Sequence, residues 1–387
     1  MARSPLALAA LATDAIPGLD VHDVRVPARA TSGTDTAIVI DAEGTRWMIR
    51  APQNPAGGAA LEAEIALLDL LVFYVDAGRL PFDVPRPAGF TPLAEGGRAV
   101  VHKQIPGRVL QLGQLGPGPG LAAAVGRAIA ALHELPVSTI EDTGLPVYTA
   151  DEYRRRRLAE VDEAAKTGLV PTTLLRRWEH ALEDVALWRF QPTVVHGDLS
   201  AEHVLCAGDA PTAILGWAEA KVADPADDLA WLLVAAPHES IDAILEAYNL
   251  RRTELRDPHL TERALLAGEL ALARWLLHGT RMADRAIIDD AVGMLAELEE
   301  LTSPAAPPAH VPDDHATTSD PDDDAEPHES DKPEAHDDYR SEPADSPAEP
   351  DEPAEPRAEP DEPAQFPPTE PPPRRQSAFS PVNPDPL

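Results

Sequence analysis

The chain has a single cysteine, Cys206, among 387 residues. One thiol excludes a disulfide framework and a metal site built from several thiolates, and it fits the reducing conditions of the cytoplasm. Cys206 directly follows the apolar residues that end VVHGDLSAEHVL. We therefore expect its thiol to be buried and unreactive.

Long apolar runs are also lacking. No stretch of the sequence approaches the roughly 20 apolar residues that span a bilayer. The first 18 residues, MARSPLALAALATDAIPG, contain a short alanine-rich run, but Asp14 lies within them and Asp20 follows soon after. Acidic residues so close to the run favour an N-terminal helix packed on the protein over a signal peptide. We expect a cytoplasmic protein that does not contact a membrane.

Basic residues are scarce. The chain has 32 Lys and Arg residues against 66 Asp and Glu residues, which gives a net charge of −34. No basic stripe interrupts this acidity, so we expect no nucleic-acid partner. The one local basic run, Arg154–Arg157, follows Tyr153 on a predicted helix. We interpret it as a solvated helix face, with one arginine turned toward a neighbouring carboxylate.

Proline and charge divide the chain near residue 303. Residues 303–387 contain 22 of the 42 prolines, with 5 basic and 23 acidic residues and hence a net charge of −18. The segment AEPDEPA occurs in them twice, at 348–354 and 358–364. Such a composition cannot bury enough apolar surface to offset the entropy of ordering, so we predict a disordered tail. The tail either keeps the protein soluble or docks a basic partner, and its composition does not choose between these roles.

The hydrophobic period changes along the remaining residues. Short β-type runs dominate between residues 23 and 107, with a hairpin signal at Glu43-Gly44 and one helix predicted over 59–75. Short strands return later only around VVHGDL, HVLCAG and TAILGW. Strands grouped first and helices later predict an α+β fold of two lobes. The later helices are predicted over 121–133, 151–166, 171–188, 239–250, 260–278 and 283–301.

We accordingly expect three domains. Residues 1–105 are predicted to form a β-rich lobe and residues 106–302 a helical lobe with a short β insertion. Residues 303–387 form the predicted disordered tail. A cleft is expected between the two lobes, with VVHGDL on its helical side.

Two acid-bearing segments lie in the predicted helical lobe. VVHGDLSAEHVL (194–205) carries Asp198 on a glycine-flanked turn, and ILGWAEAKVADPADDLA (214–230) follows with further acids. Phosphoryl transfer needs such a set, because one carboxylate receives the proton of the attacking hydroxyl and others hold the magnesium that bridges the phosphates. Aspartate is also a good turn former, so Asp198 has a purely structural explanation as well.

Together the two segments resemble the aminoglycoside/macrolide phosphotransferase family, which has a protein-kinase-like fold. The family pattern is roughly His-Gly-Asp-Leu-x-x-x-Asn-x-Leu, then Ile-Asp-Trp-x-x-Ala-x-x-Gly-Asp-Pro-x-x-Asp-Leu-Ala. The likeness covers about residues 1–302 and leaves the tail outside. It implies a bilobal fold that binds ATP or GTP with Mg²⁺ and transfers the γ-phosphate to a small-molecule hydroxyl.

The resemblance assigns roles to single residues. Asp198 falls on the catalytic aspartate, and His196 supports its loop. Asp228 falls on the aspartate that ties this loop to a helix.

The resemblance also places nucleotide contacts in the β-rich lobe. Arg50 occupies the position that contacts ATP phosphates, and Glu64 matches the helix acid that pairs with this base. Ser32 and Gly33 lie in the turn that covers the phosphates. VVHKQIPG (100–107) resembles the hinge whose backbone takes the adenine.

Several of these residues also have ordinary explanations. Arg50 could form a surface salt bridge, and Glu64 could lie on a solvated helix face with Glu62 as its rival. Asp224, just before Pro225, suits a loop cap as well as a metal ligand. Three tryptophans are interpreted as core residues: Trp217, Trp231 and Trp275.

Two residues depart from the family pattern at its metal positions. His203 stands where the family has a metal-binding asparagine, and Gly216 where it has the aspartate that binds both metals. Glycine has no ligand atom, and the loss of transition-state charge stabilisation would slow transfer by ~10³-fold or more unless another group substitutes. Mg²⁺ prefers oxygen, so Glu219 is a better substitute than the His203 imidazole.

Two functions therefore remain open. The first is an ATP-dependent small-molecule O-phosphotransferase with Asp198 as its base. Residues 1–302 carry 27 basic and 43 acidic residues, and this charge of −16 favours a cationic acceptor, such as an amino sugar or a macrolide. The alternative is a catalytically impaired, kinase-shaped binding or scaffold protein that recruits partners with its acidic tail.

Overall fold

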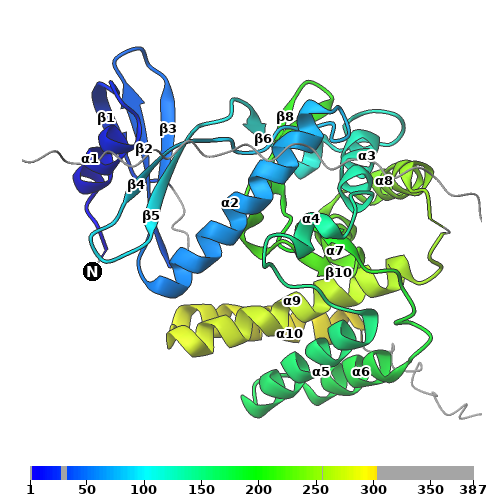
Figure 1. Cartoon of the computed structure of the whole chain (residues 1–387). Coiled ribbons are helices and arrows are strands. Elements are labelled where there is room, and N and C mark those ends of the chain that lie inside the picture. The colour runs from blue at the N-terminus through cyan, green and yellow to red at the C-terminus, as the bar shows by residue number, and fades with distance from the viewer. Residues whose placement is uncertain (1, 28–32, 255, 303–387) are drawn as a thin grey trace, which may run out of the picture. The chain divides into compact units, whose positions relative to one another are not determined.

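The computed structural model describes residues 2–27, 33–254 and 256–302. Figure 1 shows strands β1–β5 with α1 on one side, α3 and α8 on the opposite side, and α2 running between them. The order of strands first and helices later is as predicted. The strands are β1 (Val21–Arg25), β2 (Thr34–Asp41), β3 (Arg46–Pro52), β4 (Pro87–Pro92), β5 (Arg98–Lys103), β6 (Arg108–Val109), β7 (Thr193–Val195), β8 (Val204–Ala207), β9 (Ala210–Ile214) and β10 (Lys221–Ala223). The helices are α1 (Pro5–Ala15), α2 (Pro55–Asp76), α3 (Leu121–His133), α4 (Ser138–Glu141), α5 (Ala150–Lys166), α6 (Thr172–Glu183), α7 (Ala226–Ala235), α8 (His238–Arg251), α9 (Leu260–Met282) and α10 (Arg285–Thr302), with single turns η1 (Leu112–Gln114), η2 (Ala201–His203) and η3 (Trp217–Glu219).

The first five strands form one antiparallel sheet in the order β1-β2-β3-β5-β4. The hairpin predicted at Glu43-Gly44 joins β2 to β3 and is confirmed. The Asp41 carboxylate fixes this turn by accepting hydrogen bonds from the Thr45 amide at 2.7 Å and the Trp47 indole at 2.9 Å. Alternate residues of β2 and β3 are buried under α1, as a half-buried sheet requires.

Helix α2 begins four residues before the predicted start at residue 59. The Asn54 side chain accepts a hydrogen bond from the Gly57 amide at 2.8 Å, and Pro55 occupies the first turn, which together favour an early start. The first half of α2 packs on the sheet through Leu61, while Leu71 near its end belongs to the core of the helical part. The boundary between these two hydrophobic cores therefore lies within α2, before residue 105. The predicted domain limits stay a proposal.

The helical part has two hydrophobic cores. One centres on α3, α7 and α8 and the other on α5, α6, α9 and α10. The predicted β insertion is present as the sheet β6-β8-β9 and the pair β10-β7. The prediction missed α7, whose first turn carries two acids that obscure its apolar spacing. It also continued the helix at 171–188 too far, because Asp184 caps the Ala186 amide at 2.9 Å and turns the chain after Glu183.

Cys206 is a free, buried thiol, as predicted, and burial raises its pKa. No helix among the described residues is both long and apolar enough to cross a bilayer.

A buried ion pair joins α9 to the segment before α7. The Arg263 guanidinium is 1% exposed and donates to Asp224 at 2.7 and 3.1 Å and to Asp257 at 2.6 Å. Asp224 also accepts a hydrogen bond from the Ala226 amide at 2.9 Å. Burial raises the pKa of Asp224 in spite of the arginine beside it. Asp224 is therefore a loop cap and an ion-pair partner.

We expect Arg263→Met to lower the free energy of unfolding by about 3–5 kcal/mol, because it leaves the Asp224 carboxylate buried without its cation. Urea denaturation measures this change. The matched control is Arg281→Met, which breaks an exposed pair of α9 with Glu163 (2.9 Å) and should cost under ~1 kcal/mol. A loss at residue 263 no larger than the control would contradict this view of the buried pair.

Candidate active site

The His-Gly-Asp turn follows strand β7 and forms a loop that only glycine allows. Gly197 has φ +80°, in the left-handed region. A Cβ atom at Gly197 would lie 2.3 Å from both the Glu219 carbonyl oxygen and the Lys221 Nζ. The loop is therefore packed tightly against the segment that leads into β10.

The Asp228 carboxylate holds this loop from α7. It is fully buried and accepts hydrogen bonds from the backbone amides of His196 at 2.7 Å and Gly197 at 2.9 Å. It also contacts His133 Nε2 at 3.2 Å, and His133 Nδ1 contacts the Tyr248 hydroxyl at 2.8 Å. Burial raises the pKa of Asp228, but its hydrogen bonds with the His133 side chain and the His196 backbone amide outweigh burial and lower it. Asp228 thus joins the loop to three helices, in the tying role that the resemblance implies.

His196 fixes the backbone of its neighbour. Its buried ring donates from Nε2 to the Leu215 carbonyl at 2.8 Å and accepts at Nδ1 from the Asp198 amide at 3.3 Å. These partners require the neutral ring, and burial lowers the pKa of His196, which keeps it neutral. His196 is therefore a positioning residue that orients Asp198.

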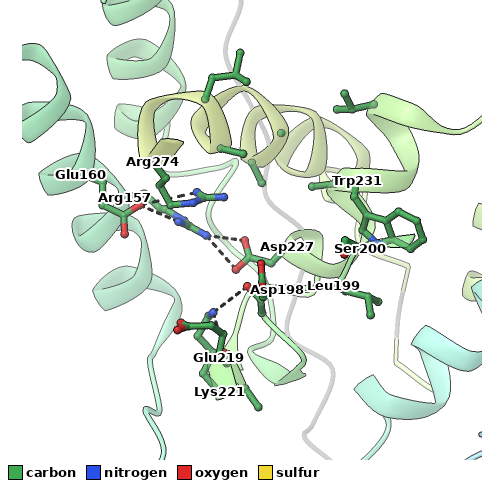
Figure 2. Close-up of a pocket in the computed structure, with 18 of the residues that line it drawn as sticks. Arg157, Glu160, Asp198, Leu199, Ser200, Glu219, Lys221, Asp227, Trp231 and Arg274 are labelled. Carbon is green, nitrogen blue, oxygen red and sulfur yellow. Dashed lines mark hydrogen bonds and ion pairs between the residues drawn. The ribbon is translucent and has the colours of Figure 1, made fainter. Parts of the chain in front are cut away.

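The Asp198 carboxylate is exposed and faces a cavity of about 970 Å³ in the helical part. Figure 2 shows it in this cavity with Glu219 and Lys221. Nearby Asp224, Asp227 and Asp228 each bind partners. Within the described residues, the carboxylates of Asp198 and Glu219 form no hydrogen bond or ion pair. They are consequently the acids here that are available to a ligand.

Arg50 and Glu64 pair between β3 and α2. The guanidinium donates two parallel hydrogen bonds to the carboxylate, at 2.6 and 2.8 Å, and Glu64 is 2% exposed. The rival acid, Glu62, instead pairs with Arg98 at 2.7 Å. Among the residues that the structure describes, the buried Arg50 Nε has no hydrogen-bond partner. The pairing implied by the resemblance is therefore present, and the surface alternatives for Arg50 and Glu64 do not hold.

The predicted phosphate-covering turn lies between β1 and β2. Ser32 lies outside the described residues. Gly33 has φ +73°, and its carbonyl accepts from the Gln53 amide at 2.9 Å. A Cβ atom on Gly57 would lie 2.8 Å from the Gly33 carbonyl oxygen, so the start of α2 packs closely against the end of this turn.

His203 and Gly216, the two departures from the family pattern, are in contact. His203 Nδ1 bonds the Asp198 carbonyl oxygen at 2.7 Å, which leaves Nε2 directed away from the loop. A Cβ atom on Gly216 would lie 2.7 Å from His203 Nε2 and Cδ2. The imidazole therefore occupies the space that a side chain at position 216 would need. The departures from the family pattern at positions 203 and 216 are thus coupled.

A magnesium site is only partly provided by these side chains. Gly216 offers no donor, and no group of three or more His, Cys, Asp or Glu residues in the described part of the chain could hold a metal ion. Mg²⁺ prefers six oxygen ligands, and Glu219 is one free carboxylate. The protein residues alone do not fit the two-metal arrangement that the resemblance implies.

The predicted site residues fall into three groups. Asp198 and Glu219 line the cavity, His203 lies against Gly216, and Arg50 with Glu64 lies between sheet and helix. The cavity lining includes neither Arg50 nor Glu64.

Several residues that line the cavity carried no functional signal in the sequence. Trp231 packs against the core and also lines the cavity, Trp275 is 38% exposed, and of the three tryptophans only Trp217 is fully buried. Lys221 carried no motif signal. The run Arg154–Arg157 was the one usable clue, since one arginine was expected to face a carboxylate, and Arg157 does so.

Comparison with known proteins connects this geometry with a family. A sequence profile described as the phosphotransferase enzyme family matches residues 27–266. The uncharacterised protein YcbJ of Bacillus subtilis is 27% identical over 241 residues, which are 60% of this chain and 77% of YcbJ.

Solved structures with the same fold include macrolide and aminoglycoside phosphotransferases. The macrolide 2′-phosphotransferase MphH of Brachybacterium faecium has a TM-score of 0.61 at 24% identity, over 75% of this chain and 97% of its own. A type I macrolide 2′-phosphotransferase reaches 0.63 at 25% identity, over 76% and 98%. The GDP complex of aminoglycoside 2′-phosphotransferase-IIIa reaches 0.64 at 21% identity, over 78% and 100%. These likenesses confirm the predicted α+β, protein-kinase-like fold class.

Because the family profile spans more than half of the chain, this protein is a member of the phosphotransferase enzyme family, with the fold of macrolide and aminoglycoside phosphotransferases.

Proposed function

We propose that the protein is an ATP-dependent small-molecule O-phosphotransferase with Asp198 as its base. The observation that carries the proposal is the free Asp198 carboxylate, which a loop held by His196 and by Asp228 of α7 presents to a cavity of about 970 Å³. A carboxylate used only to form a turn would have no need of such support.

Asp198 acts on the acceptor hydroxyl. It accepts the hydroxyl proton while the acceptor oxygen forms a bond to the γ-phosphorus and the bond from that phosphorus to the β–γ bridging oxygen breaks. The products are the phosphorylated acceptor and the nucleoside diphosphate. His196 contributes by holding the Asp198 backbone, and its neutral ring is needed for that contact.

The nucleotide binds the β-rich part in this proposal. Arg50 contacts the phosphates, since its Nε–H has no protein partner in the described part of the chain and Glu64 holds its other two nitrogens. Ser32 and Gly33 cover the phosphates, and the backbone of residues 100–107 takes the base. Related structures contain GDP and ADP, which supports ATP or GTP as the donor.

Any Mg²⁺ would use Glu219 as its protein carboxylate, with nucleotide phosphates and water supplying the remaining oxygens. His203 is a poorer ligand for this ion, although its Nε2 is available. Magnesium bound in this way would neutralise charge on the phosphates.

The acceptor is a small molecule with a hydroxyl group. Kanamycin, gentamicin and streptomycin are bound in related structures. An amino sugar or a macrolide is therefore one candidate class, and it agrees with the cationic acceptor favoured by the net charge of residues 1–302.

We also retain the predicted division into residues 1–105, 106–302 and 303–387. The tail lies outside the described residues, and its two roles, solubilising the protein or docking a basic partner, stay predictions. The alternative of a scaffold without catalysis has Gly216 and His203 as its support. The available Asp198 carboxylate favours an enzyme.

We expect Asp198→Asn to reduce phosphate transfer from ATP by about 10²-fold or more, since the amide cannot accept the hydroxyl proton. Transfer is measured as radiolabelled phosphate incorporated into a panel of amino sugars, macrolides and other hydroxyl-bearing compounds. Nucleotide binding should persist. ATP with Mg²⁺ at 100 times its Kd stabilises a folded protein by about 2.7 kcal/mol, or a Tm rise on the order of 5 °C.

The control for this test is Asp209→Asn, the same change at an exposed loop aspartate outside the cavity lining. It should leave transfer unchanged. Transfer that survives in Asp198→Asn refutes the base assignment, and absence of any Tm shift with ATP in the wild-type protein favours the scaffold.

The contact between His203 and Gly216 generates a second prediction. Gly216→Asp alone should destabilise the protein without raising transfer, because its Cβ would meet the imidazole at 2.7 Å. The double variant His203→Asn, Gly216→Asp removes this clash and restores both family ligands. We expect its Mg²⁺-dependent turnover of ATP to exceed the wild-type rate at least about tenfold.

Position 216 has φ +84°, which aspartate tolerates better than most residues. His203→Asn alone is the matched control, since it opens the space without adding a carboxylate. If Gly216→Asp alone raises turnover as much as the double variant does, the two positions are not coupled.

A further inference from the structure

One side of the cavity is built from arginines. Arg156 and Arg157 on α5 and Arg274 and Arg281 on α9 all line it; we call these four residues the arginine wall. Figure 2 shows Arg157 and Arg274 reaching into the cavity that contains Asp198. A second cavity, of about 530 Å³, is also lined by Arg156, Arg274 and Arg281, so part of the wall is open to ligands from two directions.

The arginine wall has fewer carboxylate partners than guanidinium groups. Glu160 is shared by Arg157 at 2.8 Å, Arg156 at 3.4 Å and Arg274 at 4.0 Å. Arg157 also pairs with the buried Asp227 at 2.9 Å, and the Tyr153 hydroxyl contacts both residues. Three cations therefore face two carboxylates.

The fourth arginine does not change this balance. Arg281 pairs with Glu163 at 2.9 Å, and both side chains are largely exposed. The arginine wall therefore keeps one positive charge in excess.

Arg274 is the member without an adequate partner. Its Nη1 is buried and has no hydrogen bond within residues 2–27, 33–254 and 256–302, and its Glu160 contact is too long to be one. Burial lowers the pKa of Arg274, and the neighbouring Arg157 lowers it further. A buried guanidinium nitrogen left unpaired costs free energy that a ligand acceptor would recover.

Lys221 adds a further cation beside Asp198. Its Nζ donates only to backbone carbonyls, of Glu219 at 3.2 Å and Gly197 at 3.5 Å, and it has no carboxylate partner in the part of the chain that the structure describes. The free carboxylates of Asp198 and Glu219 line the same cavity. Asp198, Glu219 and the arginine wall thus line one cavity, in which phosphate transfer is proposed.

We propose that the acceptor carries an anionic group, a carboxylate or a phosphate, which binds Arg274 while its hydroxyl lies at Asp198. This inference rests on the proposed phosphotransferase function and specifies its substrate class. A guanidinium recognises either anion through two parallel hydrogen bonds. An amino sugar would instead bring a cation to a wall that already has one cation in excess.

The test uses hexoses that differ in charge. Glucuronate and glucose 6-phosphate carry the two anions, glucose is neutral and glucosamine is cationic; kanamycin and a macrolide represent the acceptors of related enzymes. Phosphate transfer from ATP is measured with wild type, Arg274→Gln, Arg274→Lys and the control Arg177→Gln. Arg177 lies on α6 and pairs with Glu269, which is on α9 like Arg274. Arg177 does not line the cavity.

We expect wild type to have a higher kcat/KM for at least one anionic hexose than for glucose or glucosamine. Arg274→Gln should raise KM for the anionic hexose about 10- to 100-fold, with a smaller change in kcat, because a charge-assisted hydrogen bond is lost. Arg274→Lys should retain part of the preference, and Arg177→Gln all of it.

Preference for glucosamine, kanamycin or the macrolide overturns the inference and leaves the proposed function intact. Equal use of the anionic hexose by wild type and Arg274→Gln also overturns it, as does absence of transfer to all six compounds by a protein that binds ATP. Absence of ATP binding, measured as a Tm shift, instead removes the proposed function.

Discussion

The buried carboxylate of Asp228 is the interaction on which this site depends. Its two oxygens accept hydrogen bonds from the backbone amides of His196 and Gly197. The chain therefore leaves strand β7 in a single direction, and Asp198 faces the cavity. The left-handed turn at Gly197 and the neutral ring of His196 complete that geometry. Because two adjacent amide donors point at one carboxylate, replacing either oxygen by a donor would leave a buried amide unpaired.

Charge in this protein acts locally. The chain has an excess of acids over its whole length, which by itself favours a cationic ligand. Buried side chains interact mainly with their immediate neighbours, and in the cavity those neighbours include Arg274, whose Nη1 has no hydrogen-bond partner in the described part of the chain. Net charge describes how a ligand approaches, and the side chains that line the cavity determine what is held there.

Much of the fold and part of the site could be predicted from sequence. Strand and helix periods identified the two parts, and short motifs indicated Asp198, Asp228 and the Arg50–Glu64 pair, because each depends on residues close in sequence or on a family pattern. The coupling of His203 with Gly216 could not be predicted, since it arises from a packing distance between two separate segments. The partners of Arg157 and Arg274 likewise come from α7 and α5, and no local signal announces such contacts.

The most direct measurement of the central claim is amide hydrogen exchange in Asp228→Asn, combined with phosphate transfer. Asparagine preserves the size of the side chain but turns one acceptor into a donor that faces either the His196 or the Gly197 amide. The account predicts that exchange protection of these two amides falls about 10- to 100-fold and that transfer falls with it, while ATP still raises the Tm. Unchanged protection of both amides with wild-type transfer would contradict it.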